Sequence, residues 1–442
     1  MSSEAAAETL LPTDAPVDLP PGQRIRILGY LSVLLLLLGF GAPYLGLIDT
    51  PIAFFLKNKL HMHAAQVAQF RLISGLPLYF SFLFGFARDT WNPFGLRDRG
   101  YMMIFGALCA AIYVYFAFVP VTEWTLLAAV ILATIAFLFA VSAQQGLSSV
   151  IGRQNVMSGQ VSAVWNVVTS IPGLIAFALG GVLSDALEGR NAESAARTLF
   201  LIGAAMMAAL ALFAIWRPKV VYDNVQDEHK AAFHPWTDVK RLVKHWPIYP
   251  ALAIWLLWNF APGSQTPLQY YLQDTLHADD AAFGWFNAIF AGSFIPTFLL
   301  YGFLCRKVAL RPLLWWGTIV AVPQMVPLAF IHSEQSALIA AVPIGLMGGV
   351  SSAAYIDLLI RSCPKGLEGT VLMMSTGLYY IASRPGDILG TWLYEKFGGF
   401  TICVIAITVV YALIVPTLLL VPKRLISTPD GVAPPEGGFD RD

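Results

Sequence analysis

Residues 124–150 read WTLLAAVILATIAFLFAVSAQQGLSSV, a mostly apolar stretch without a charged side chain. A helix needs about 20 mostly apolar residues to cross the roughly 30 Å hydrocarbon core of a bilayer, so this stretch predicts a membrane-spanning helix. The whole chain agrees in composition. Of its 442 residues, 57% are hydrophobic and 12% are charged, about half the charged fraction of a soluble domain. The sequence therefore predicts an integral α-helical membrane protein.

Eleven further apolar stretches of similar length lie on either side of this one. Several contain Gly or Pro, which membrane helices tolerate where neighbouring helices or water satisfy the backbone. We therefore predict an all-α membrane protein with twelve transmembrane helices. The expected spans are 27–56, 64–87, 100–120, 124–150, 156–184, 197–216, 247–273, 279–304, 312–331, 335–360, 367–393 and 398–421.

Basic residues are distributed unevenly over the expected loops. With the N-terminus in the cytoplasm, the tails and loops on that side hold 20 of the 27 Lys and Arg residues. Cytoplasmic loops carry an excess of these residues, so both termini are expected inside. The one long internal loop divides the spans six and six. The predicted organisation is a disordered tail (1–23), a six-helix bundle (24–216), a cytoplasmic linker (217–246) with a short amphipathic helix around Trp236–His245, a second bundle (247–424) and a disordered tail (425–442).

Three short segments carry a family resemblance. The segments GFARD (85–89) and GLRDRGY (95–101) look like the loop 2–3 motif of the major facilitator superfamily. The segment RSCPKGLEGT (361–370) resembles a Cys-Pro-x-Gly-x-Glu stretch of the folate–biopterin transporter family. The resemblance implies the major facilitator fold, with two pseudo-symmetric six-helix halves. It also implies secondary active transport of a small organic solute by alternating access.

The chain departs from that family at positions expected to contact the substrate. Ser81-Phe82 replaces a lysine–proline pair in helix 2, Val141 and Gln145 stand where acidic residues are usual, and Arg384 is an addition. The leading hypothesis is transport of a folate- or pterin-like heteroaromatic anion. Two alternatives stay open: a carrier of muropeptides or amino sugars, and a non-transporting membrane receptor or assembly factor.

Four ionisable residues stand out inside expected spans, all in the predicted outer half of the membrane: Asp49, Arg71, Arg384 and Asp387. A charge at the bilayer centre costs about 2.5–3.5 kcal/mol on insertion scales, so such residues are functional candidates. Arg384 and Asp387 are three positions apart and share a helix face. The resemblance places helices 1, 2 and 11 near one another. We therefore expect one charged cluster that closes an outer gate or holds an anionic substrate, with Asp49 the preferred proton-coupling residue.

A second charged set is expected at the cytoplasmic face. Asp89 should lie against the start of helix 11 near Gly366–Thr370, because exposed N–H groups and the helix dipole favour a carboxylate there. Such an arrangement would hold the inner side shut and release it when the conformation switches. The predicted inner gate comprises Asp89, Arg97, Asp357, Arg361 and Glu368.

Polar and aromatic residues at mid-span depth are the candidates for substrate binding. A flat heteroaromatic ligand would suit them, because aromatic rings stack on it and amides fix its edges. The same residues also fit ordinary packing or interface anchoring. The candidates are Gln145, Asn166, Trp258, Asn259, Gln265, Asn287, Tyr380 and, for an anionic group, Arg384.

Other features restrict the function class. The sequence holds no GxxxxGK[ST] phosphate loop, HExxH motif or CxxC pair, and this argues against an ATP-driven pump and an enzyme. The net charge is zero and implies no nucleic-acid partner. Cys109, Cys305, Cys363 and Cys403 are expected to be core residues. We expect no cofactor, a monomer in the cell (inner) membrane, and a small-molecule substrate with protons or another ion as the coupling partner.

Overall fold

In the computed structural model all regular elements of the described residues are helices. The described residues are 19–432 except 45–47, 50–51, 53–54, 63, 93–94, 120–121, 179–191, 224–234, 279–281 and 398.

The first part of the chain, up to the long loop, contains eight α-helices and one short π-helix within the described residues. They are α1 (Pro21–Gly41), η1 (Phe55–Lys59), α3 (Ala64–Ser74), α4 (Leu76–Tyr79), α5 (Phe82–Thr90), α6 (Asp98–Phe118), α7 (Glu123–Gln154), α8 (Ser158–Ala178) and α10 (Ala192–Phe213). The loop region carries α11 (Lys219–Tyr222) and α12 (Pro235–Lys244).

The second part contains the remaining helices of the described residues. It consists of α13 (Ile248–Asn259), α14 (Thr266–Tyr270), η3 (Tyr271–Thr275), α15 (Ala282–Leu304), α16 (Leu310–Ala321), η4 (Val326–Phe330), α17 (Glu334–Ser362), α18 (Glu368–Phe397), α19 (Thr401–Ala412), α20 (Ile414–Leu418) and α21 (Lys423–Ile426).

Helices occupy part of every predicted span, and eight helical stretches in the described residues are long and apolar enough to cross a membrane. In two of the other predicted spans, local breaks divide the helix into shorter pieces. Pro77 lacks an N–H and its ring clashes with the preceding turn, so the helix predicted over 64–87 is broken between α3 and α4. The helix predicted over 247–273 unwinds after Asn259, where Gly263 takes a φ of 96° that favours glycine.

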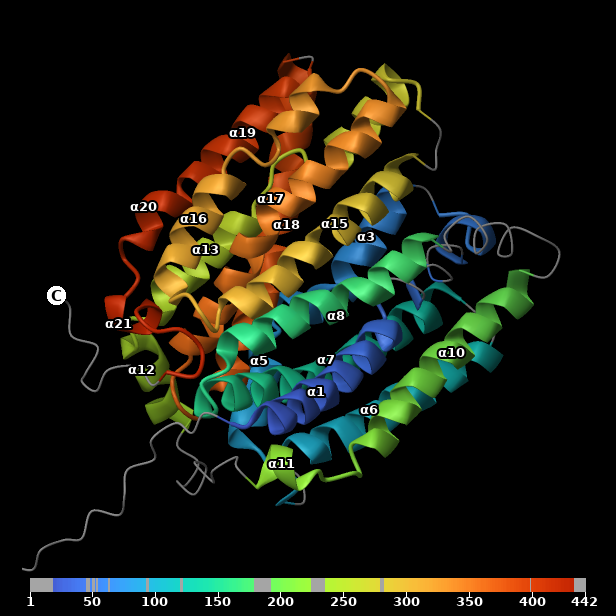
Figure 1. Cartoon of the computed structure of the whole chain (residues 1–442). Coiled ribbons are helices and arrows are strands. Elements are labelled where there is room, and N and C mark those ends of the chain that lie inside the picture. Colours follow the sequence, from blue (N-terminus) through green and yellow to red (C-terminus); the bar gives the residue numbers. More distant parts are fainter. Residues whose placement is uncertain are drawn as a thin grey trace, which may run out of the picture.

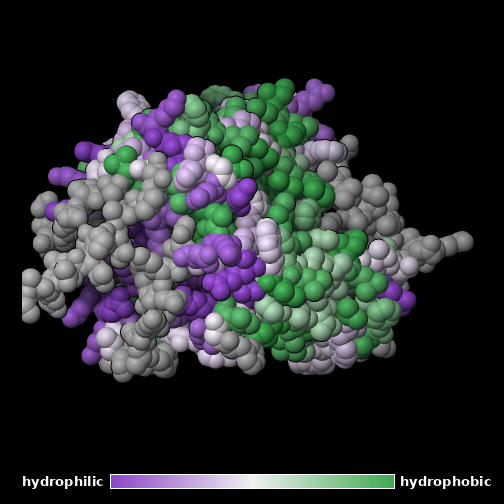
Figure 2. All heavy atoms as spheres, turned by 60° about the horizontal axis from the view of Figure 1, so that its bottom comes forward, coloured by the Kyte–Doolittle hydropathy of each residue, from purple (hydrophilic) through white to green (hydrophobic). Residues whose placement is uncertain are grey.

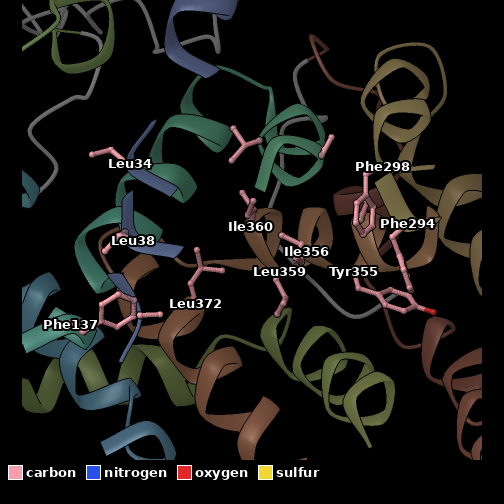
Figure 3. Close-up of a cluster of buried hydrophobic side chains, with 14 of the residues drawn as sticks. Leu34, Leu38, Phe137, Phe294, Phe298, Tyr355, Ile356, Leu359, Ile360 and Leu372 are labelled. Carbon is pink, nitrogen blue, oxygen red and sulfur yellow. The ribbon is translucent and has the colours of Figure 1, made fainter. Parts of the chain in front are cut away.

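Helices from the two parts of the chain pack side by side (Figure 1). The helix α18 contacts α5 and α7, while α8 contacts α15 and α17. A large buried apolar cluster runs through both parts. Figure 3 shows part of this cluster, to which Leu34 and Leu38 of α1, Phe137 of α7, Ile360 of α17 and Leu372 of α18 belong. The two parts therefore share one packed core.

The surface separates into hydrophilic and hydrophobic areas. In Figure 2, hydrophilic residues gather on the side where α12 and α21 lie in Figure 1, and hydrophobic residues cover a broad area beyond them. Large apolar side chains such as Trp124, Ile339 and Leu419 are more than 70% exposed. Such exposure suits a bilayer as solvent, because lipid rather than water meets these side chains.

Several local expectations can be compared with this fold. The four cysteines are free and buried, which confirms their assignment to the core. The helix α12 confirms the amphipathic helix around Trp236–His245. Of the linker, residues 224–234 lie outside the described part of the chain.

The two predicted tails differ from expectation where they meet the bundle. The helix α1 already begins at Pro21, within the predicted tail 1–23, of which residues 1–18 lie outside the described part. The prediction of a disordered tail from residue 425 is wrong over 425–432. Leu425, Ile426 and Asp430 are buried there, because the apolar side chains after Pro422 pack back onto the bundle. Residues 433–442 lie outside the described part.

Candidate functional site

Asp89, near the end of α5, joins α5 to the start of α18. Its carboxylate accepts hydrogen bonds from the backbone N–H of Gly369 at 3.1 Å and of Thr370 at 2.7 Å, and from the Thr370 hydroxyl at 2.7 Å. These N–H groups belong to the first turn of α18, where no helical carbonyl is available to them. The expected contact between Asp89 and the start of this helix is present in the structure.

Arg88 and Asp98 extend this contact, and the sequence analysis did not assign either to the gate. The Arg88 guanidinium donates to Asp89 at 2.7 Å and to both carboxylate oxygens of Asp98 at 2.6 and 2.8 Å. The side chains of Arg88, Asp89 and Asp98 are 7%, 0% and 8% exposed. Buried charges need partners of opposite sign, and Arg88 supplies the partner for both carboxylates. The position of Arg88 directly before Asp89 was the available signal.

A second ion pair links α7 to α18. Arg153 donates to Glu368 at 2.7 Å and to the carbonyl of Cys363 at 2.8 Å. Glu368 is buried, as its place in the predicted inner gate requires. Arg153, which the sequence analysis did not assign to the gate, is its partner. Removing Arg153 would leave the buried carboxylate of Glu368 without its cationic partner.

A third ion pair lies at the end of α17. Arg361 donates to Asp357 at 2.8 Å and to the hydroxyl of Ser158, the first residue of α8, at 3.0 Å. Arg97 differs from these residues. It precedes α6 with a φ of 52°, and its backbone N–H donates to the side chain of Asn92. The ion pairs of Asp89, Glu368 and Asp357 thus lie at one end of the bundle, which we call the paired end.

A small cavity of about 70 Å³ lies away from the paired end. Arg384 lines it, 16 positions after Glu368, roughly 24 Å along α18 at 1.5 Å per residue. Asp49 and Arg71 also line it and form an ion pair. The complete lining is Pro43, Tyr44, Asp49, Ile52, Phe70, Arg71, Ser74, Gly75, Leu78, Tyr79, Val130, Thr134, Tyr380 and Arg384.

Two polar groups in this cavity lack hydrogen-bond partners among the described residues. Arg384 is exposed and takes part in no hydrogen bond or ion pair there, although Asp49 and Arg71 line the same cavity. The buried hydroxyl of Thr134 finds no partner either. Tyr380 contributes an aromatic wall, with its ring centroid 6.0 Å from that of Tyr44 and 6.4 Å from that of Tyr79. The sequence analysis missed Thr134, Tyr44 and Tyr79.

The predicted single cluster of four charges is wrong for Asp387. Its carboxylate accepts hydrogen bonds from the backbone N–H of Thr266 at 2.9 Å and from the Thr266 hydroxyl at 2.6 Å. Asp387 therefore caps α14, the helix that resumes after the break in the span predicted over 247–273. A carboxylate is favoured at a helix start, and this explains why Asp387 turns to Thr266 rather than to Arg71.

The remaining binding candidates fall into three pairs. Gln145 donates to Thr376 of α18 at 3.2 Å, and Asn166 accepts from Ser352 of α17 at 3.4 Å, so both reach the other part of the chain. Asn259 and Asn287 instead donate to carbonyls of their own helices. Trp258 stacks on Tyr411 with ring centroids 5.0 Å apart, and Gln265 is exposed just before α14.

The structure therefore combines a bundle of apolar helices, buried ion pairs at one end where the Arg153–Glu368 pair and the hydrogen bonds of Asp89 join its two parts, and a charged cavity farther along α18. This combination defines a multi-pass membrane transporter. The family model described as Major Facilitator Superfamily matches residues 155–386, and the chain belongs to this superfamily.

Known relatives agree with this assignment. The chain is 22% identical over 401 residues to a protein named folate-biopterin transporter from Synechocystis sp., covering 86% of this chain and 79% of the relative. Two solved transporters share the fold. The proton:xylose symporter XylE matches with a TM-score of 0.66 and 12% identity over 90% of this chain and 95% of its own. The transporter FucP in the outward conformation matches with a TM-score of 0.64 and 16% identity, over 90% of this chain and 99% of FucP.

Proposed function

We propose that the protein is a twelve-helix secondary transporter with both termini in the cytoplasm of the cell (inner) membrane. Two six-helix bundles (24–216 and 247–424) would alternate around a central site, joined by the linker 217–246. The excess of Lys and Arg on one side supports this orientation, and a helix in part of each predicted span supports the number of spans. In this arrangement the paired end is the cytoplasmic end, and the conformation has its inner side closed.

The substrate that fits the cavity best is a small organic anion with an aromatic ring. The observation that carries this proposal is Arg384, an exposed cation in a cavity with three tyrosines. A guanidinium binds a carboxylate with two parallel hydrogen bonds, and the rings of Tyr44, Tyr79 and Tyr380 offer stacking surfaces. The unpartnered hydroxyl of Thr134 can bond a polar ring atom. A folate- or pterin-like anion has these features, and the Synechocystis relative supports it.

The cavity is too small to hold the proposed substrate in this conformation. Pockets for drug-sized ligands measure about 300–1,000 Å³, whereas this cavity has about 70 Å³. A pterin would therefore enter only when the outer ends of the helices move apart. We propose that Tyr380 and Arg384 of α18 move away from Tyr44 and Tyr79 in that step.

Ligand-induced stabilisation of the purified protein tests the substrate class. A ligand at 100 times its Kd should stabilise the native state by about 2.7 kcal/mol, seen as a higher unfolding temperature. We expect a shift with folates and methotrexate, whose carboxylates can pair with Arg384, and none when Arg384 is replaced by Gln. A shift with amino sugars or muropeptides alone would replace the pterin assignment. No shift with any transportable solute would favour a receptor or assembly role.

Asp49 is proposed as the proton-coupling residue. Its carboxylate pairs with Arg71 in the cavity wall, so protonation would release Arg71 and couple proton binding to the substrate site. We expect Asp49→Asn to keep substrate exchange between equal concentrations but to lose accumulation driven by a pH gradient. Counterflow and uptake by proteoliposomes measure the two activities, with Asp274→Asn, at an exposed position, as the control. Gradient-driven accumulation by Asp49→Asn at the normal rate would exclude this role.

A further inference from the structure

The C-terminal segment 423–432 is a folded part of the paired end. It begins with α21, in which Leu425 and Ile426 are 8% and 3% exposed. The chain then turns, and Gly431 adopts a φ of 89°. Asp430, just before that turn, is 3% exposed. An aspartate this deeply buried in a terminal segment requires partners.

Backbone hydrogen bonds tie this segment to both parts of the chain. The N–H of Asp430 donates to the carbonyl of Cys305 at 2.8 Å, just after α15. The N–H of Gly431 donates to the carbonyl of Val156 at 2.7 Å, in the turn before α8. The segment therefore bridges the contact between α8 and α15. Movement of these two helices apart would break one of the two bonds.

The side chain of Asp430 strengthens the bridge. Its carboxylate accepts from the backbone N–H of Gly159 at 3.2 Å and of Gln160 at 2.9 Å, both in the first turn of α8. It also accepts from Arg361 of α17 at 3.0 Å. Asp430 thus satisfies the start of a helix in the first part of the chain and a cation in the second.

Arg361 serves two carboxylates at once. It donates to Asp357 at 2.8 Å and to Asp430 at 3.0 Å, and also to the carbonyls of Leu425 and Thr428 at 3.3 and 2.8 Å. The side chains of Asp357 and Asp430 are 0% and 1% exposed. With both carboxylates ionised, Asp357, Asp430 and Arg361 together carry a net charge of −1, which the charge of Arg24 offsets only in part. Taking up one proton from the adjacent water removes that net negative charge.

We propose that residues 423–432 form a pH-sensitive latch that holds the paired end closed, and that the latch binds a proton when it closes. Detachment of Asp430 would release α8 from α15 and α17 and free the paired end to open. The proposal is independent of the substrate, because it concerns only the conformation of this end. We call residues 423–432 the latch.

The direction of the pH effect follows from the surroundings of Asp430. Burial, and next the charge of Asp357, raise the pKa of Asp430 from 3.8 to about 6, against the opposing effect of Arg361. A raised pKa in the closed state means that the proton stabilises closure. This stabilisation is complete below about pH 4 and is lost as the pH rises through 6. Among the described residues, the titratable and charged groups around Asp430 and Asp357 are Arg361 from α17, Tyr301 and Cys305 at the end of α15, and Arg24 of α1, whose charge interacts with those of Asp430 and Arg306.

The thiol of Cys305 provides a native reporter of the latch. It lies 3.6 Å from the Asp430 carboxylate and is 1% exposed. In the full-length purified protein, its alkylation rate can be measured by peptide mass spectrometry, relative to the denatured protein at the same pH. For the wild type, we expect this relative rate to be about tenfold lower at pH 5.0 than at pH 7.5. This factor follows from an Asp430 pKa of about 6 in the closed state and of 3.8 when the latch is detached.

Three variants test separately whether the latch holds the paired end closed and whether Asp430 binds the proton. Asp430→Ala, and independently truncation after Ile426, should raise the relative rate at pH 7.5 by about tenfold or more. Asp430→Asn mimics the protonated carboxyl and should abolish the pH dependence while keeping the rate low. Asp223→Ala, in an exposed ion pair with Arg217, is the matched control. Cys403, buried elsewhere in the bundle, reports that the fold is intact.

Two results would overturn the proposal. If Cys305 reacts as slowly in Asp430→Ala and in the truncated protein as in the wild type, the segment does not hold this end closed. If the wild-type rate is independent of pH, or the dependence persists in Asp430→Asn, Asp430 does not bind the proton. Neither result would affect ligand binding in the Arg384 cavity, so the proposed function stands or falls separately.

Discussion

Arg384→Gln is expected to lower substrate uptake by about 30-fold or more while the protein remains folded in the membrane. Arg384 is the cation that the cavity leaves available for an anionic group, since Arg71 is paired with Asp49. Loss of one charged partner from a desolvated pair costs about 2–5 kcal/mol, and 2 kcal/mol already corresponds to about 30-fold. Initial uptake rates in proteoliposomes measure the effect. Because Arg384 forms no structural ion pair among the described residues, stability should change little.

Two further variants make this result specific. Arg384→Lys keeps the charge but loses the planar pair of donors, so we expect partial activity and weaker binding. Arg311→Gln removes an exposed arginine at the start of α16 and should transport normally. Normal uptake by Arg384→Gln would exclude an anion site at this residue. A misfolded Arg384→Gln protein, seen by gel filtration, would mean that the guanidinium has a structural role.

The sequence predicted those features that depend on local chemistry. Mean apolarity over about 20 residues located the helices, since the bilayer thickness sets their length. The contact of Asp89 with the first turn of α18 was also predictable, because a carboxylate and exposed N–H groups attract each other wherever the fold brings them together. Asp357 and Arg361 lie four positions apart, so one helix pairs them.

Contacts that depend on which helices pack against each other could not be predicted from the sequence in this way. Asp387 shares a helix face with Arg384, yet it bonds Thr266, whose N–H is exposed only because the preceding helix unwinds. Asn259 and Asn287 occupy suitable depths, but their side chains turn back to carbonyls of their own helices. Sequence spacing gives the face of a residue and not the rotamer of its side chain.

The C-terminal segment illustrates how composition can mislead. Prolines and glycine around residues 429–437 are typical of disordered chain. Two apolar residues, Leu425 and Ile426, and one buried carboxylate are nevertheless enough to hold residues 423–432 in place. Asp430 finds its partners in α8 and α17. These partners are more than 60 positions away, and no local pattern shows them.

Gly85→Val is expected to abolish transport by preventing closure of the paired end. A Cβ atom at Gly85 would overlap the backbone of α18, lying 2.6 Å from the carbonyl carbon of Gly369 and 2.8 Å from the Cα of Thr370. Real Cβ atoms do not approach backbone so closely, and a backbone cannot swing aside as a side chain can. The helices α5 and α18 would have to separate.

That separation would also break the hydrogen bonds of Asp89, because they cross the same contact. We therefore expect uptake to fall at least tenfold, and the arginine pairs at this end to become accessible to arginine-modifying reagents such as phenylglyoxal. Gly29→Ala in α1 is the matched control, since a Cβ there meets nothing within 4 Å. Gly85→Ala should show a smaller loss, as the smaller side chain needs less separation. Wild-type uptake by Gly85→Val would show that transport proceeds without this closed contact, and the role proposed for Asp89 would have to be abandoned with it.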